Sequence, residues 1–172
     1  IFLDTKIFDI PNQVAKTIKI ISKIKSIQYF TIHALGSTEM MQAAQKAAAG
    51  TNLEFLAVSI LTSWDKSNLE QIGITHELKD QVKILIELAN QAKLSGIIAS
   101  AQDIGLARQI SKDIKIFCPG IRGDHNTQDQ KRTVSYKEFS AIADDKCFAV
   151  IGRPIYEGDP IENIKKIINS AR

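Results

Sequence analysis

The sequence has few cysteines and no long apolar run, the features that mark disulfide-rich, zinc-binding and membrane proteins. It contains only two cysteines in 172 residues, Cys118 and Cys147, and they form no C-x-x-C pair and no ligand cluster with the three histidines. This usage predicts neither a disulfide framework nor a zinc site, and it is typical of small core residues in a reducing cytoplasm. No apolar run approaches the roughly 18–20 residues that a membrane helix needs, so no membrane association is predicted.

The chain also lacks a strong excess of one charge. Its 22 Lys and Arg residues against 19 Asp and Glu residues give a net charge of +3, which is too mild to predict binding to nucleic acid. No G-x-G-x-x-G or G-x-x-x-x-G-K-S/T motif follows any β-rich segment, which argues against a nucleotide-binding open sheet. Without a linker rich in proline or glycine, residues 1–172 are predicted to form one domain.

What the sequence does contain is a strict alternation of β-rich segments and helical patterns. Several of the β-rich segments are apolar on both faces, as strands of a buried parallel sheet are. Amphipathic spacing and helix-start signals, such as the Ser135–Glu138 capping box and Asp159 before Pro160, mark the helices between them. The predicted strands are Phe2–Ile7, Tyr29–Ala34, Phe55–Leu61, Gly96–Ser100, Ile114–Cys118 and Phe148–Gly152.

Six alternating units fit either an open doubly wound sheet or a (β/α)8 barrel. The missing nucleotide motifs weaken the first, whereas a barrel requires eight units and about 250 residues. The sequence starts at Ile1, next to a predicted strand. We therefore predict an α/β fold, a (β/α)8 TIM barrel, with six of the eight units in this chain and the first two units absent from it.

The carboxyl ends of the strands are where a barrel carries its functional groups. Asp4 and Lys6 lie two residues apart, so a regular strand would direct them to the same side. Asp9 follows in the turn before Pro11. A charged pair at the mouth of a barrel suits proton transfer, but a purely structural ion pair is an equally good interpretation of the spacing alone.

The same residues carry a family resemblance. The segment FLDTKIFDIPN resembles the D-x-K-x-x-D-I-P-N signature of the bacterial type of orotidine 5′-phosphate decarboxylase. The segments HALGS, LAVSILTS, GIIASAQD, PGIR, DQKR and VIGRPI follow in the family's order, so that the resemblance covers essentially the whole chain. It implies a lyase of pyrimidine biosynthesis that converts orotidine 5′-phosphate to UMP and CO2 with no cofactor and no metal.

The resemblance also implies roles for individual residues. Lys6 would protonate the carbanion at C6, with Asp4 holding it in place. Asp9 would complete the active site of the other subunit of a cytoplasmic homodimer, and Ile10 and Gln13 would face the neighbour's substrate. The family usually has threonine at the position of Gln13. The family's substrate-binding aspartate on its first strand and a further lysine on its second are expected to be absent from this chain.

Substrate contacts would come from the later strands. Thr62 matches the residue that contacts the pyrimidine, although a threonine at a strand end often serves only the backbone. Arg122, Gln130, Gly152 and Arg153 match the substrate-binding set, the last three around the phosphate. Barrels often bind phosphate with the loops after their last two strands. The polar segment RGDHNTQDQKRT would act as a lid, and His33 is interpreted as a structural histidine.

Two alternatives stay open at this point. A sugar-phosphate decarboxylase or synthase of the same superfamily would share D-x-K-x-x-D and would use Mg²⁺. A catalytically silent barrel that binds phosphate ligands would show the same phosphate-contacting residues without turnover.

Overall fold

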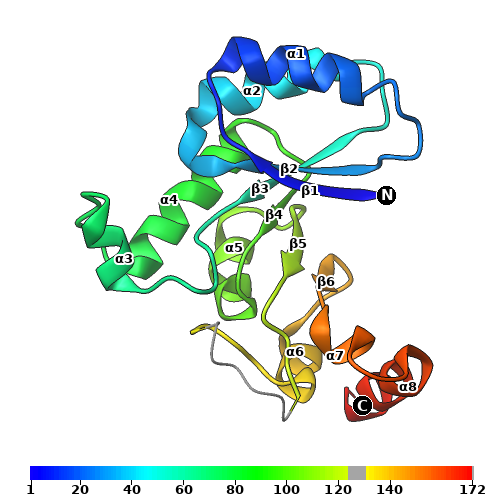
Figure 1. Cartoon of the computed structure of the whole chain (residues 1–172). Coiled ribbons are helices and arrows are strands. Elements are labelled where there is room, and N and C mark those ends of the chain that lie inside the picture. Colours follow the sequence, from blue (N-terminus) through cyan, green and yellow to red (C-terminus); the bar gives the residue numbers. More distant parts are fainter. Residues whose placement is uncertain (124–130, 172) are drawn as a thin grey trace.

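A computed structural model describes residues 1–123 and 131–171 of the chain. Six parallel strands form one sheet in the order β1-β2-β3-β4-β5-β6, so each strand lies beside its neighbours in the sequence (Figure 1). The strands are β1 Phe2–Ile7, β2 Tyr29–His33, β3 Glu54–Val58, β4 Gly96–Ile98, β5 Lys115–Cys118 and β6 Cys147–Ala149. This sequential parallel order is the one that a (β/α)8 barrel has.

All six predicted strands are present, but four of them end earlier than the apolar runs suggest. The prediction continued β3 to Leu61 and the last strand to Gly152, whereas they end at Val58 and Ala149. The backbone leaves the sheet where polar side chains take over its hydrogen bonds. The predicted fourth strand, for example, continued to Ser100, but β4 ends at Ile98, and the Ser100 hydroxyl accepts a hydrogen bond from the Gln102 N–H that opens a 3-10 turn.

Helices follow every strand. They are α1 Pro11–Ile21, α2 Ser37–Ala47, α3 Lys66–Gln71, α4 Leu78–Gln91, α5 Ile104–Ile110, α6 Tyr136–Ile142, α7 Arg153–Tyr156 and α8 Pro160–Ser170, with 3-10 turns η1 Ala34–Gly36 and η2 Ala101–Asp103. The predicted starts are confirmed, because Ser135 and Glu138 form a capping box and Asp159 accepts hydrogen bonds from the first turn of α8. These caps satisfy N–H groups that a helix start leaves unpaired.

The core lies between the sheet and the helices on its outer side. Val14 and Ile18 of α1 and Met40 of α2 are completely buried, and so are Phe30 and Phe55 of the adjacent strands. The rings of Phe30 and Phe55 meet edge to face with their centres 6.1 Å apart. Burial of each such side chain away from water stabilises the fold by about 1.5–3 kcal/mol. Together they hold α1 and α2 against the neighbouring strands β2 and β3.

The sheet is strongly curved, because residues from distant strands meet on its inner face. The ring of Phe2 in β1 lies 5.6 Å from that of Phe117 in β5, and Tyr29 of β2 lies 5.1 Å from Phe117. Phe117 also stacks on Phe148 of β6 at 4.8 Å. The contacts of Phe117 with strands three and four places away require a sheet that curls around an interior, as a barrel does.

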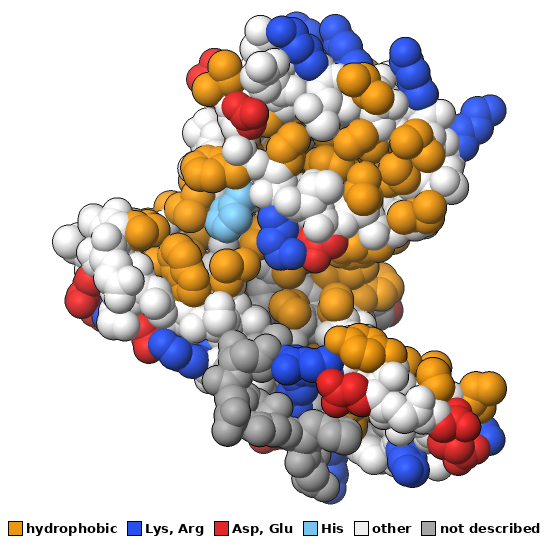
Figure 2. Space-filling view, viewed as in Figure 1, with side chains coloured by type: hydrophobic (Ala, Val, Ile, Leu, Met, Phe, Trp, Pro, Cys, Tyr) orange, Lys and Arg blue, Asp and Glu red, His pale blue; other side chains and the backbone are white. Residues whose placement is uncertain are grey.

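Within the described residues β1 and β6 are the two edges of the sheet. Phe148, Val150 and the α8 residues Ile161, Ile164 and Ile168 are all exposed by 38% or more of their surface. Figure 2 shows hydrophobic side chains on both sides of a hollow between β1 and the C-terminal helices. The helix predicted from the apolar spacing at the end of the chain is confirmed as α8. No other described residues bury the side chains of Ile161, Ile164 and Ile168 on its apolar face.

Among the described residues, none of the helices combines the length and the apolar character needed to span a bilayer.

Candidate functional site

Asp4 and Lys6 form an ion pair at the carboxyl end of β1. The Lys6 Nζ donates a hydrogen bond to the Asp4 Oδ2 at 2.7 Å, and the two side chains are 41% and 47% exposed. Both face the inner side of the curved sheet, since they line a cavity there. The predicted pairing of these two residues is therefore confirmed by the structure.

The reason given for that pairing is wrong in detail, because β1 is not a regular strand at this point. Leu3 is opposite Phe30 of β2 and Ile7 is opposite Ile32, so three residues of β1 face only Thr31. Lys6 has a φ of 48°, a left-handed conformation that residues other than glycine rarely adopt. A bulge, and not the ordinary alternation of a strand, brings the two charges together.

Thr31 holds this bulge in place. Its side chain is completely buried, and its hydroxyl donates a hydrogen bond to the Asp4 Oδ1 at 2.8 Å while accepting one from the Lys6 N–H at 2.8 Å. The Thr31 carbonyl accepts a weaker bond from the Thr5 hydroxyl at 3.3 Å. Thr31 was not predicted as a site residue. The signal was a threonine inside an otherwise apolar run, YFTIHA, because a buried hydroxyl needs a polar partner.

A cavity of about 380 Å³ opens beside the ion pair. It lies at the carboxyl ends of the strands, where the barrel prediction places the site. Its walls are mostly apolar, and Asp4 and Lys6 supply the formal charges, a combination that is typical of small-molecule sites. The lining residues are Phe2, Asp4, Lys6, Val58, Ile60, Leu61, Thr62, Ser63, Ile98, Ala99, Pro119 and Val150.

Thr62 lines this cavity and is mostly buried, with 9% of its surface exposed. Its carbonyl accepts hydrogen bonds from the N–H groups of Lys131 at 3.0 Å and Arg132 at 3.2 Å. The backbone of Thr62 is thus fixed by a segment about 70 residues away in the sequence. The structure brings Thr62 to the same cavity as Asp4 and Lys6, as predicted.

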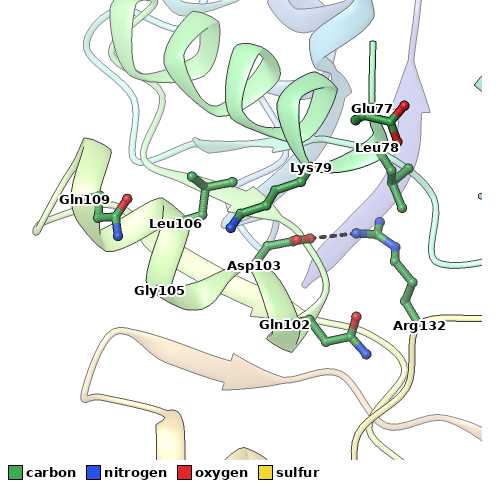
Figure 3. A pocket seen from close by; sticks show the side chains of 9 residues that line it. All are labelled: Glu77, Leu78, Lys79, Gln102, Asp103, Gly105, Leu106, Gln109 and Arg132. Atoms are coloured by element: carbon green, nitrogen blue, oxygen red, sulfur yellow. Dashed lines mark hydrogen bonds and ion pairs between the residues drawn. The ribbon is translucent and has the colours of Figure 1, made fainter. Parts of the chain in front are cut away.

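Arg132 is in turn anchored by its own side chain. Its Nη1 donates to the Asp103 Oδ2 at 2.8 Å and its Nη2 donates to the Ile60 carbonyl at 2.7 Å. Both side chains of the ion pair are at least nine-tenths buried. They line a second cavity of about 610 Å³ beside the start of α4 (Figure 3).

Burial raises the pKa of Asp103, and the Arg132 guanidinium acts in the opposite direction. This pair was not predicted from the sequence. Asp103 and Arg132 are 29 residues apart and belong to no recognisable spacing, so only the fold shows that they meet.

Of the other predicted substrate residues, Arg122, Gly152 and Arg153 do not line the 380 Å³ cavity. Gly152 precedes α7 and Arg153 is its first residue, directly after the β6 edge of the sheet. Arg122 is 8% exposed, and its Nε has no hydrogen-bond partner among the described residues. Gln130 lies outside the described residues, as does most of the predicted lid segment.

Asp9, Ile10 and Gln13 lie together where the chain passes from β1 into α1. Asp9 accepts a hydrogen bond from the Ile10 N–H at 2.7 Å, and among the described residues its carboxylate forms no ion pair. Ile10 is 63% exposed and Gln13 is exposed as well. These three residues are thus presented to the outside, on the same segment as the Asp4–Lys6 pair.

His33 serves the local backbone, as predicted. Its Nδ1 accepts a hydrogen bond from the Leu35 N–H at 3.3 Å. Burial lowers the pKa of His33, and the positive charge of Lys6 lowers it further. Across residues 1–123 and 131–171, no group of three or more His, Cys, Asp or Glu side chains could hold a metal ion.

Comparison with known proteins gives a consistent result. The family model described as "Orotidine 5'-phosphate decarboxylase / HUMPS family" matches residues 1–167. A protein named orotidine 5′-phosphate decarboxylase from Wolbachia pipientis subsp. Culex pipiens (strain wPip) is 39% identical over 172 residues, covering 99% of this chain and 75% of that protein. One of the same name from Ehrlichia chaffeensis is 39% identical, covering 99% of this chain and 74% of that protein.

Solved structures agree with the fold. The crystal structure of orotidine 5′-phosphate decarboxylase from Lactobacillus acidophilus superposes with a TM-score of 0.80 at 28% identity, covering 99% of this chain and 75% of that one. That of the enzyme from Methanocaldococcus jannaschii, complexed with inhibitor BMP, has a TM-score of 0.71 at 23% identity, covering 98% of this chain and 72% of that one. The prediction of an α/β barrel is confirmed, with six parallel strands in this chain.

Proposed function

The chain belongs to the orotidine 5′-phosphate decarboxylase / HUMPS family, and from this premise we propose that it decarboxylates orotidine 5′-phosphate to UMP and CO2 without a cofactor. The observation that carries the proposal is the Lys6 ammonium, paired with Asp4 at 2.7 Å, on the wall of a mostly apolar cavity at the mouth of the barrel. The names of the relatives support this reaction over others on the same fold.

In the proposed reaction the bond between C6 of the pyrimidine and its carboxylate breaks. CO2 leaves, and the electron pair of that bond stays on C6 as a carbanion. The Lys6 ammonium stabilises this negative charge and then transfers a proton from Nζ to C6, which gives UMP. Lys6 afterwards recovers a proton from solvent. Asp4 keeps the ammonium at the wall of the cavity through their ion pair.

We assign substrate contacts to residues around the same opening. Thr62 is placed for the pyrimidine because it lines the cavity that Lys6 enters. Gly152 and Arg153 are assigned to the phosphate, where an arginine side chain offers a fork of donors. Arg122 and Gln130 complete the proposed set. The position of Gly152 and Arg153 at the start of α7, after the last strand, supports this assignment.

We also propose that the protein acts as a cytoplasmic homodimer in which Asp9 completes the partner's active site. The support is the outward position of Asp9, Ile10 and Gln13 on the segment that follows Lys6. In an isologous dimer this segment of each subunit faces the same segment of the other. Gln13 would then contact the ribose of the substrate bound mainly by the partner.

Subunit exchange tests this shared site. Lys6→Ala and Asp9→Asn homodimers should both be nearly inactive. After equal amounts are mixed and exchange freely, about half the dimers are heterodimers. One site of each heterodimer takes Lys6 from the Asp9→Asn chain and Asp9 from the Lys6→Ala chain and is therefore intact. Roughly a quarter of wild-type activity should then return if the sites are independent. If mass spectrometry shows exchange and activity stays at the level of the parents, Asp9 acts within its own chain.

The proposed reaction itself is tested by the loss of orotidine 5′-phosphate absorbance with the intact protein in the presence of EDTA. We expect full turnover, with UMP as the product by chromatography. Activity that disappears with EDTA and returns with Mg²⁺ would favour the sugar-phosphate alternative. Binding of UMP with no turnover would favour a silent binding barrel.

A further inference from the structure

We propose that Thr31 is a positioning residue for the decarboxylation, which orients Asp4 and Lys6 as one unit. The inference rests on the proposed function, since it assumes that these two residues act on the substrate. It starts from the irregularity of β1, where Asp4, Thr5 and Lys6 stand opposite Thr31 alone.

The bulge leaves Lys6 without the backbone partner that a regular parallel ladder would give it. The N–H of Lys6 is instead satisfied by the Thr31 hydroxyl at 2.8 Å. Lys6 holds a φ of 48°, and a residue whose backbone keeps such a conformation must be fixed by its surroundings. The hydroxyl of Thr31 provides this constraint from the neighbouring strand.

The same hydroxyl carries a second bond, to the carboxylate that pairs with Lys6. It uses its single proton on the Asp4 Oδ1 at 2.8 Å, while the Asp4 Oδ2 accepts from the Lys6 Nζ at 2.7 Å. One buried side chain therefore fixes the carboxylate orientation and the lysine backbone at once. Because Asp4 and Lys6 are both about half exposed, the buried Thr31 is the rigid point of the arrangement.

A residue of similar shape without a hydroxyl could not replace Thr31 in holding Asp4 and Lys6. Valine has the shape of threonine and the same preference for strands, but it can neither accept from the Lys6 N–H nor donate to Asp4. Serine keeps both functions and loses only a methyl group. Thr31 lies outside the residues that line the cavity, so its loss should alter the chemical step and spare ligand binding.

The test compares Thr31→Val, Thr31→Ser and Ser59→Ala in the intact protein. Ser59 is the matched control, because it is also buried in a strand-end region and its hydroxyl donates to the Ile98 carbonyl at 2.9 Å, away from Asp4 and Lys6. We expect Thr31→Val to lower kcat about 10- to 100-fold, the effect of losing a hydrogen bond to a charged group. KM and the Kd of UMP should stay within about threefold, and Thr31→Ser should recover most of kcat.

Each outcome decides the proposal. A kcat for Thr31→Val within twofold of wild type overturns the proposal. A loss of kcat in Thr31→Ser as large as that in Thr31→Val also overturns it. So does an equal loss of kcat in Ser59→Ala, when the two variants have the same thermal stability. If Thr31→Val does not fold, Thr31→Ala takes its place in the same comparison. An inactive wild-type protein would refute the proposed function instead, so the two failures are distinguishable.

Discussion

The buried ion pair between Asp103 and Arg132 gives the sharpest prediction about stability. Asp103→Asn removes the carboxylate charge but keeps the shape of the side chain. The guanidinium of Arg132 would then remain charged and at least nine-tenths buried, with its Nη2 still donating to the Ile60 carbonyl. Arginine cannot lose its proton to relieve this, so a large part of the cost of an unpaired buried charge is expected.

The magnitude follows from this burial. Breaking a buried ion pair on one side costs about 3–5 kcal/mol, and we expect about 3 kcal/mol because asparagine still offers one acceptor oxygen. For a chain of this size that corresponds to a fall in Tm of roughly 6–12 °C. The matched control is Asp113→Asn, since the Asp113 side chain is 92% exposed in its pair with Lys146, and loss of such a solvent-screened pair should leave the stability almost unchanged.

Replacement of the other partner, Arg132, should give a loss of stability that depends on pH. In Arg132→Met, Asp103 loses the cation that opposes the rise of its pKa. A carboxyl whose pKa is higher in the folded protein than in the unfolded chain destabilises the fold as pH rises through these values. The stability deficit of Arg132→Met should therefore be smallest near pH 4 and larger at pH 7, whereas that of Asp103→Asn, which has no carboxyl to titrate at this position, should not grow with pH.

Urea unfolding followed by circular dichroism measures both effects, with the slope of each transition checked against wild type. A loss of stability for Asp103→Asn that is as small as that of Asp113→Asn would refute the reasoning from burial. An active but unstable Asp103→Asn protein should also bind UMP less well, because Arg132 helps to fix the carbonyl of Thr62.

Two further predictions concern the charges at the mouth. The pKa of His33 is lowered first by burial and then by Lys6, so in Lys6→Ala an NMR titration should show the pKa of His33 rising while staying below its ordinary value; an unchanged pKa would mean that Lys6 does not act on His33. Arg153→Ala should weaken UMP binding by about 1.5–3 kcal/mol, typical of a charged hydrogen bond, and leave uridine binding almost unchanged by calorimetry; equal losses for both ligands would make Arg153 structural.

The fold could be predicted largely from the sequence, because the information is local and repetitive. Strands such as Phe55–Val58 are apolar on both faces, and helix starts such as Ser135 carry their caps within a few residues. The ends of the strands could not be predicted. They depend on polar side chains with distant partners, such as the Ser59 hydroxyl, which follows the end of β3 and donates to the Ile98 carbonyl.

The candidate site was predictable only in part for the same reason. Asp4 and Lys6 are neighbours, so their spacing alone suggested a pair. The bulge that brings them together depends on Thr31, which lies on another strand. Asp103 and Arg132 meet only because the fold brings η2 beside the segment that begins at residue 131, and no spacing rule connects them.

The central claim is that Lys6 supplies the proton in decarboxylation, and Lys6→Ala in the intact protein tests it most directly. Turnover of orotidine 5′-phosphate with EDTA present should fall by at least the ~10²–10⁴ of a general acid, while UMP should still bind. Lys19→Ala, at an exposed position of α1, should keep wild-type turnover. A Lys6→Ala protein that retains a tenth of wild-type turnover would contradict the account.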